Sequence, residues 1–338
     1  MNKFSRRFFT LLVLFFFIAP VFAVNTLALG NSLDAVSKEK TAIVYLQKMQ
    51  KAYTEKNYEI LYVTSLQSEV EPMQLLHGVI DGEGLTYIRY LNGAIRESLQ
   101  SSSQISYFEQ GNQPYTLATN VDRSVFAKIT HFNYKAGLNS YSYVVVGKGR
   151  IAGKRALVIH LISKDPYSYS YMIWLDLKSS LPLRLDTITN RNLLIEREEV
   201  VSLFVTEDVN PWLMKISQKR LPQLVHINKT KSKSLWKLNW LPPGFKIIKS
   251  DQHKLDSNDN KSVSYLMLSN GIVRVSVYIS AIKSATGKEK IIQHGSTLIY
   301  TLKQGRREVT IIGEIPIQNA QRIVQSISRE KPWHKKPV

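Results

Sequence analysis

The residues that could carry out chemistry are sparse and scattered along this chain. None of its 338 residues is cysteine, which excludes disulfides, thiolate catalysis and cysteine-held metal sites. The seven histidines stand singly, and no two share a spacing typical of metal ligands. The chain lacks a Gly-x-Ser-x-Gly turn, a His-Glu-x-x-His helix and a phosphate-binding loop ending in Gly-Lys-Ser/Thr. We therefore predict no catalytic residue, no metal site and no cofactor, and we expect that the protein is not an enzyme.

One glycine-rich segment, GKGRIA at 147–152, loosely fits a dinucleotide-binding pattern after a predicted strand. The stretch that follows it, KRALVIHLI, alternates like a strand, whereas that motif requires a helix. We interpret the segment as a hairpin turn.

The positive charge of the mature chain lies in its last third. Residues 24–214 carry 19 basic and 19 acidic side chains, whereas residues 215–338 carry 23 basic and 7 acidic ones, a net charge of +16. An asymmetry of this size indicates an anionic partner, although a basic domain that is merely soluble is the alternative. The candidate contact residues are Lys229, Lys231, Lys233, Arg306 and Arg307.

The first 23 residues have the pattern of a secretory signal peptide. Lys3, Arg6 and Arg7 precede an apolar run over 8–18, and small residues end the segment at Ala23. An uncleaved signal anchor is the alternative, and no later stretch is long enough to cross a bilayer. We expect a soluble protein in the periplasm. That compartment excludes nucleic acid as the partner and leaves an acidic protein segment or anionic lipid headgroups.

Hydrophobic periodicity predicts a mainly β fold with flanking helices. An amphipathic helix is expected over 37–54, where the apolar stripe consists of Ile43, Leu46, Met49 or Gln50, and Tyr53. Alternating segments between 58 and about 118 predict strands, and Asp81-Gly82 and Asn92-Gly93 are typical of hairpin turns. A short helix is expected over 120–132. Further strands are expected at 139–147, 150–162, 168–176, 182–190 and 194–206. This order predicts a large curved sheet with helices on one face.

Two of these strands share a pattern of alternating tyrosine and serine, SYSYVVV at 140–146 and SYSYMIWL at 168–175. The pattern places Tyr141, Tyr143, Tyr169 and Tyr171 on one face of the sheet. Rigid amphipathic rings of this kind are suited to lining a cavity for an apolar chain. The alternative is that the four rings pack beneath the covering helices.

A second domain is expected after the lysine-rich stretch INKTKSKSLWKLN at 227–239. WLPPGF at 240–245 predicts a rigid turn, in which Trp240 and Phe245 are expected to anchor a core. A hairpin on Asn270-Gly271 and strands near 292–302 and 308–313 follow. Apolar residues then recur at helical spacing over 317–327, after Pro316. We expect a compact β-rich domain closed by one helix.

These segments resemble the MucB/RseB family of periplasmic regulators. The resemblance rests on ISYFEQGNQPYTL at 105–117, YSYMIWLD at 169–176 with LPLRLD after it, WLPPGF with the later YLMLSNGIVRVSV, and EVTIIGEIPIQNAQRIVQSI. It spans nearly the whole mature chain. Two residues depart from the family pattern: Asn270 stands where aspartate is usual, and Arg274 where a small residue is usual. Asparagine and aspartate both tolerate positive φ in a turn, so the departures bear on a local contact and not on the fold.

The resemblance implies a half-open β-barrel like that of lipoprotein carriers at 24–220, a linker at 221–235, a smaller domain at 236–330 and a basic tail at 331–338. It also implies that the protein binds the periplasmic part of a membrane-spanning anti-sigma factor and shields it from proteolysis. The shielding restrains the envelope-stress sigma response, and a lipid or lipopolysaccharide-like amphiphile relieves it. No oligomeric state is predicted. The rival hypothesis is a periplasmic carrier of lipid or lipoprotein, against which the second domain argues, because a shuttle needs only the cavity.

Overall fold

The computed structural model describes residues 25–66, 69–225, 236–254 and 262–329. The predicted signal peptide, most of the predicted linker and the basic tail lie outside these ranges. The described helices are α1 (Asn25–Glu55), α2 (Ala127–Thr130), α3 (Pro211–Ser217) and α4 (Ile317–Gln325), with the 3-10 helix η1 (Ala136–Asn139). From Lys38 onward the chain belongs to one compact unit, and its strands form a large sheet, a smaller sheet and a short strand pair.

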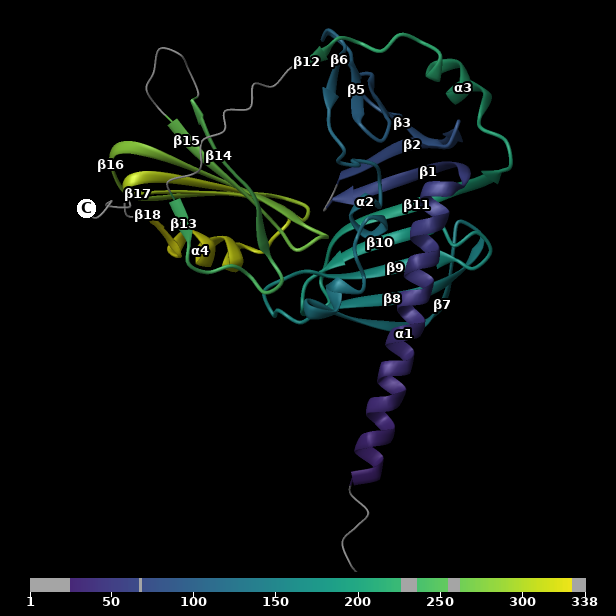
Figure 1. Ribbon diagram of the computed structural model, residues 1–338, viewed down its shortest axis with the longest axis horizontal. Helices are drawn as coiled ribbons and strands as arrows, with labels where there is room; N and C mark the ends of the chain where they lie inside the picture. The colour runs from purple at the N-terminus through teal and green to yellow at the C-terminus, as the bar shows by residue number, and fades with distance from the viewer. Residues whose placement is uncertain (1–24, 67–68, 226–235, 255–261, 330–338) are drawn as a thin grey trace, which may run out of the picture. The chain divides into compact units, whose positions relative to one another are not determined.

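The first sheet has twelve strands and accounts for the chain up to Val225. They are β1 (Asn57–Leu66), β2 (Glu69–Ile80), β3 (Glu83–Tyr90), β4 (Arg96–Gln100), β5 (Gln104–Glu109), β6 (Tyr115–Ala118), β7 (Tyr141–Ile151), β8 (Lys154–Ser163), β9 (Ser170–Asp176), β10 (Pro182–Ile188), β11 (Leu194–Thr206) and β12 (Leu224–Val225). Their order is β12-β6-β5-β4-β3-β2-β1-β11-β10-β9-β8-β7. The sheet curves but stays open, with β12 and β7 at its edges (Figure 1), as the predicted half-open barrel requires. The last strand, β12, lies within the predicted linker.

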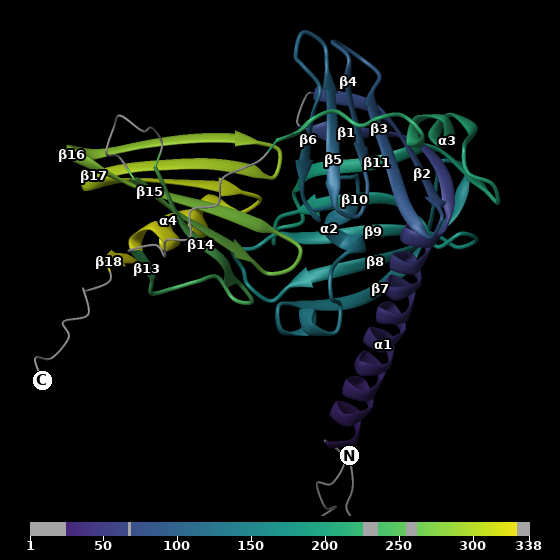
Figure 2. The same ribbon diagram turned by 45° about the horizontal axis from the view of Figure 1, so that its top comes forward.

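The part of α1 from Lys38 onward covers the concave face of this sheet (Figure 2). The predicted stripe is its buried face, and Leu46 and Met49 are fully buried. Gln50 uses its side chain instead to bind a backbone segment opposite, described below. The helix is therefore held by apolar burial along one face, as its periodicity predicts.

The predicted helix over 120–132 is mostly absent, and this is a correction. Only α2 is helical, and the residue before it, Phe126, has a φ of +64° that ends any helix arriving from the N-terminal side. Asp122 Oδ1 accepts a hydrogen bond from the backbone N–H of Ser124 at 2.8 Å. This bond offers the chain an alternative to helical hydrogen bonds. Residues 119–132, here called the covering segment, are largely irregular.

One helix was not predicted. In α3 the side chain of Asn210 accepts from the Trp212 N–H at 2.9 Å, and Pro211 occupies the first turn. The helix buries Leu213 in a small cluster of its own with Leu76 and Tyr87. Seven residues are too few to show a periodic pattern, although the cap and the proline are both legible in the sequence.

The second sheet comprises β14 (Lys246–Lys254), β15 (Ser262–Ser269), β16 (Arg274–His294) and β17 (Thr297–Gly313), in that order. A short pair, β13 (Trp236–Leu238) with β18 (Ile327–Arg329), accompanies it. The hairpin on Asn270-Gly271 joins β15 to β16, and α4 buries the predicted apolar face, with Ile323 and Val324 in the core. The bounds of the strands expected near 292–302 and 308–313 are wrong. Residues 292–294 end β16, a turn follows, and residues 297–302 and 308–313 both belong to β17. The β16–β17 hairpin has register shifts between Ala281 and Lys288.

Candidate functional site

The two sheets meet along a junction built from residues far apart in the sequence. The WLPPGF turn lies at one end of it. Phe245 N–H donates to the Pro242 carbonyl at 3.0 Å, and Gly244 has a φ of +80°. A Cβ on Gly244 would collide with the side-chain oxygen of Ser140, just before β7. The turn therefore packs its backbone directly against the first sheet, and only glycine permits this approach.

The β15–β16 hairpin contacts the same region. Asn270 Oδ1 accepts from the N–H groups of Ile272 and Val273 at 3.0 and 2.8 Å, which fixes the turn. Its Nδ2 donates to the hydroxyl of Tyr141 at 3.1 Å. Asn270 thus closes its own turn and bonds to the first sheet.

A buried amide and a partly buried ion pair tie α4 and its neighbourhood to the first sheet. Asn319 Nδ2 donates to the Tyr167 carbonyl at 2.9 Å and lies 3.2 Å from Asp165 Oδ2. Lys128 of α2 pairs with Glu314 at 3.0 Å. Burial lowers the pKa of Lys128, but the carboxylates of Glu198, Glu314 and Glu196 outweigh this effect and raise the pKa above its ordinary value. The ammonium form therefore persists.

The hairpin between β16 and β17 supplies a third contact. Ser296 donates through its side-chain oxygen and its backbone N–H to Glu196 of β11. A Cβ on Gly295 would meet the side chain of Leu66. Burial raises the pKa of the neighbouring Glu198 to about 7, an effect that Lys128 opposes.

A cavity of about 530 Å³ lies at this junction. Both sheets contribute to its lining, which includes Tyr169, Arg191, Leu193, Leu194, Gln293 and Ile317. Leu193 is 61% exposed and Leu194 is 49% exposed. Arg191 is its single charged residue. We call this the junction cavity. Its volume suits a small ligand, and its lining mixes apolar side chains with polar ones such as Thr189, Asn190 and Gln318.

All four candidate tyrosines lie in the packed core. Tyr141, Tyr143 and Tyr171 are at most 1% exposed. The hydroxyl of Tyr143 donates to the Tyr134 carbonyl at 2.9 Å, and the Tyr141 ring lies 6.1 Å from that of Tyr171. Their placement matches the alternative that the rings pack beneath covering elements. Tyr169 lines the junction cavity, and burial raises its pKa to about 12, so its hydroxyl stays neutral.

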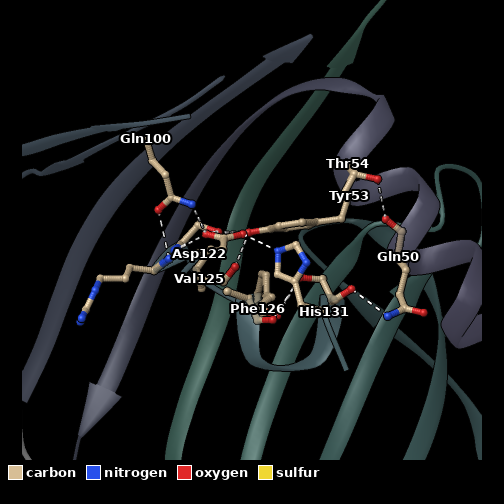
Figure 3. Close-up of polar contacts among 12 residues, drawn as sticks. Gln50, Tyr53, Thr54, Gln100, Asp122, Val125, Phe126 and His131 are labelled. Carbon is tan, nitrogen blue, oxygen red and sulfur yellow. Dashed lines mark hydrogen bonds and ion pairs between the residues drawn. The ribbon is translucent and has the colours of Figure 1, made fainter. Parts of the chain in front are cut away.

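The covering segment is fixed by hydrogen bonds from α1 and by hydrogen bonds to its own carboxylate, that of Asp122. Gln50 Nε2 donates to the carbonyls of Thr130 and Phe132, each at 2.8 Å. Tyr53 from α1 bonds to Ser124 at 2.8 Å. Asp122 accepts from Gln100 at 2.9 Å and lies 2.8 Å from His131 Nε2 (Figure 3). Burial raises the pKa of Asp122, but its bonds to His131 and Ser124 outweigh this and lower it.

The candidate basic and aromatic residues of the second half have distinct places. Lys229, Lys231 and Lys233 lie outside the described residues. Arg306 is exposed, whereas Arg307 Nη1 donates to the Ile327 carbonyl at 2.8 Å. Trp240 is half-buried, and the guanidinium of Arg322 lies 4.0 Å from the centre of the Trp240 ring. Phe245 is buried. In the described ranges no three His, Asp or Glu side chains gather as a metal site.

Two family descriptions match the chain, the MucB/RseB N-terminal domain over residues 41–225 and the MucB/RseB C-terminal domain over 230–328. The chain belongs to the MucB/RseB family. The sigma-E factor regulatory protein RseB of Escherichia coli K12 is 30% identical over 284 residues, which cover 83% of this chain and 89% of that protein.

Solved structures of MucB share the fold of this MucB/RseB member. MucB in the complex structure of Pseudomonas aeruginosa MucA/MucB is 22% identical, with a TM-score of 0.70, and covers 86% of this chain and 99% of its own. MucB in complex with MucA(peri) gives a TM-score of 0.68 at the same identity and coverage. The family relatives are named as regulators, in agreement with the expectation that the chain is not an enzyme.

Proposed function

We propose that this protein is a periplasmic negative regulator of the envelope-stress response. It binds the periplasmic part of a membrane-spanning anti-sigma factor and shields it from proteolysis. The observation that carries the proposal is that both halves match the family, so the second domain that a simple carrier lacks is present. A relative is named as a sigma-E regulator, and MucB has been solved with MucA(peri).

The periplasmic location is part of this proposal. It is supported by the signal-like pattern of residues 1–23. Among the helices that the structure describes, none has the length and apolar character needed to cross a bilayer.

An amphiphile in the junction cavity would act on partner binding through the contact between the two sheets. The apolar lining from Leu193, Leu194 and Ile317 suits an acyl chain, and Arg191 suits an anionic headgroup. Because both sheets supply the wall, a ligand there changes the free energy of their association. A coupling of about 1–3 kcal/mol would lower partner affinity roughly 5–150-fold.

Titration of the mature protein with the periplasmic part of the anti-sigma factor tests this proposal. Micromolar or tighter binding that protects the partner from a protease is expected. Saturating anionic amphiphile should weaken that binding, and Leu193→Asp should remove the weakening while leaving binding without amphiphile intact. Absence of binding would refute the regulator. Binding that no amphiphile alters would refute the ligand control alone, and lipid transfer between vesicles without partner binding would favour a carrier.

A further inference from the structure

One end of the first sheet, opposite the junction, gathers basic side chains. The β7–β8 turn and the β9–β10 turn are neighbours there, because the Leu177 N–H donates to the Arg155 carbonyl at 2.9 Å. Strand β10 runs from this end toward Thr189, which lines the junction cavity. Five basic residues occupy the two turns and the strand ends beside them: Lys148, Arg150, Lys154, Arg155 and Lys178. We call this surface the basic end.

The charges of the basic end are not neutralised within the described part of the chain. Residues 146–156 and 176–180 contain one acidic residue, Asp176. Its carboxylate is buried and accepts from the backbone N–H and the hydroxyl of Ser179, at 2.9 and 2.6 Å. No carboxylate of the described residues forms an ion pair with any of the five cations. Residues 24–214 have no net charge, so the basic end is a local excess of positive charge in a neutral region.

Two of the five cations stand directly opposite each other. In the antiparallel β7–β8 pair, Arg150 is the partner of Arg155. Like charges in this position are destabilising, and an anion bound between them offsets the repulsion. Basic residues on an edge strand such as β7 also prevent unwanted strand pairing. That role does not account for Arg155, which lies on the inner strand β8, or for Lys178, which lies in a turn. The arrangement therefore favours an external anion.

Exposed aliphatic side chains accompany the cations. Val146 of β7 is 53% exposed, and Leu177 of the β9–β10 turn is 39% exposed. The charged and aliphatic groups are spread over β7, β8 and the β9–β10 turn, whereas an extended peptide follows a single strand. A ligand that contacts all of them must be broad. A bilayer of anionic lipids meets this requirement, since it offers a continuous layer of phosphate and an interface that takes up aliphatic groups.

We propose that the basic end docks on the surface of an anionic bilayer. Its five cations face the phosphate headgroups, and Val146 and Leu177 enter the interface between headgroups and acyl chains. The proposal goes beyond the proposed function, which concerns a protein partner and an amphiphile at the junction. Docking on vesicles requires neither of these, so the two proposals can fail separately.

Sedimentation of the full mature chain with lipid vesicles tests the proposal. Vesicles of phosphatidylcholine that contain about one third phosphatidylglycerol should bind the protein, with an affinity that falls as salt is added, and pure phosphatidylcholine vesicles should not. The last third of the chain also attracts anionic vesicles through its net charge of +16. Variants are therefore needed to assign the binding to the basic end.

Arg155→Gln combined with Lys178→Gln removes two of the five cations and leaves the edge strand unchanged. Each basic residue at an anionic surface contributes about 1 kcal/mol, so this double variant should bind anionic vesicles about 25-fold more weakly. The matched control, Lys219→Gln combined with Arg220→Gln, removes one lysine and one arginine at exposed positions outside the basic end. It should weaken binding by no more than about twofold, because distant charges are screened. Equal weakening by the two double variants would overturn the proposal.

A fluorescent label locates the contact independently of affinity. The chain has no cysteine, so Leu177→Cys can be labelled at a single site with a polarity-sensitive dye. Its emission should shift to the blue when phosphatidylglycerol vesicles are added. The same dye at Gln218→Cys, an exposed position at the end of α3, should not shift. A shift at neither position, or an equal shift at both, would refute docking through the basic end.

A soluble oligoglutamate peptide distinguishes a bilayer from an acidic protein partner. If the peptide bound to the parent and not to the Arg155→Gln, Lys178→Gln variant, while vesicles failed to bind, the basic end would be a protein contact and the proposal would be wrong. Thermal unfolding certifies that the variants are folded. The Arg155→Gln, Lys178→Gln variant should melt no lower than the parent, because the repulsion between Arg150 and Arg155 is relieved.

Discussion

Asn319 of α4 donates from Nδ2 to the backbone carbonyl of Tyr167, 2.9 Å away and 152 residues earlier in the chain. Asn319 is fully buried, and the same nitrogen lies 3.3 Å from the Ser168 hydroxyl. Buried amides are costly when unpaired, so this residue fits its position only while the two sheets are in contact. Asn319 is thus a marker of the assembled junction.

Asn319→Leu should therefore destabilise the junction. The Tyr167 carbonyl loses its donor, and the expected cost is about 1–3 kcal/mol in the free energy of unfolding. Urea denaturation followed by tryptophan fluorescence measures it. Gln325→Ala, at an exposed position on the same helix, is the control and should change stability by less than about 0.5 kcal/mol. Equal stability of the two variants would contradict the role assigned to Asn319.

The two aromatics of WLPPGF should contribute unequally. Phe245 is 7% exposed, so Phe245→Ala should cost about 3–5 kcal/mol. Trp240 is half-buried and holds Arg322 over its ring, so Trp240→Ala should cost less, about 1–3 kcal/mol. Thermal unfolding of both variants gives the order. A Trp240→Ala protein that melts like the parent but no longer binds its partner would make Trp240 a contact residue.

Arg306 and Arg307 are adjacent in the sequence but differ in environment, so their alanine variants can be compared as a matched pair. Arg306→Ala should slow partner association about two- to fivefold and flatten its salt dependence, because exposed charges act mainly on the rate of encounter. Arg307→Ala should instead lower stability by about 1 kcal/mol, since its hydrogen bond to Ile327 is lost. Stopped-flow association at low and high salt separates the two effects. Association that is insensitive to salt would remove the case for charge steering.

Glu198 should give the protein a stability that depends on pH. Burial raises its pKa from 4.5 to about 7, so the folded state holds a proton that the unfolded state releases. Stability then falls as pH rises from 4.5 through about 7. The carboxylates of Glu196 and Glu314 and the ammonium of Lys128 face the same group. The loss of unfolding free energy between pH 5 and pH 8 should be about 1–3 kcal/mol larger for the parent than for Glu198→Gln. Parallel pH profiles would show that Glu198 does not titrate in this range.

Local patterns predicted the elements of the fold well. Period-two alternation identified the long strands, and helical spacing identified the buried stripe of α1. The same alternation put Tyr141 and Tyr143 on the inner face correctly. It could not say whether that face is hollow, because Phe132 and Tyr134, which pack against these rings, belong to an irregular segment that has no periodicity.

The site was less predictable because the residues that form it lie far apart in the sequence. The junction contacts of Asn319, Lys128 and Glu196 each join residues 100 or more positions apart. No single window of sequence contains such a pair. The gathering of acidic side chains on the concave face of the first sheet was hidden for a related reason. Residues 24–214 are neutral overall, and only the curvature of the sheet collects Glu97, Glu109 and Glu198 around one space.

The absence of a side chain at Gly244 also constrains how this sequence can vary. Because any Cβ there collides with Ser140, positions 140 and 244 cannot enlarge independently. A library randomised at both positions and selected for folding should return glycine at 244, since the positive φ penalises other residues whatever stands at 140. Position 140, by contrast, should accept only small residues while 244 packs against it. Gly244→Ala should therefore strain the contact between the two sheets at this turn while leaving the strands of each sheet unchanged.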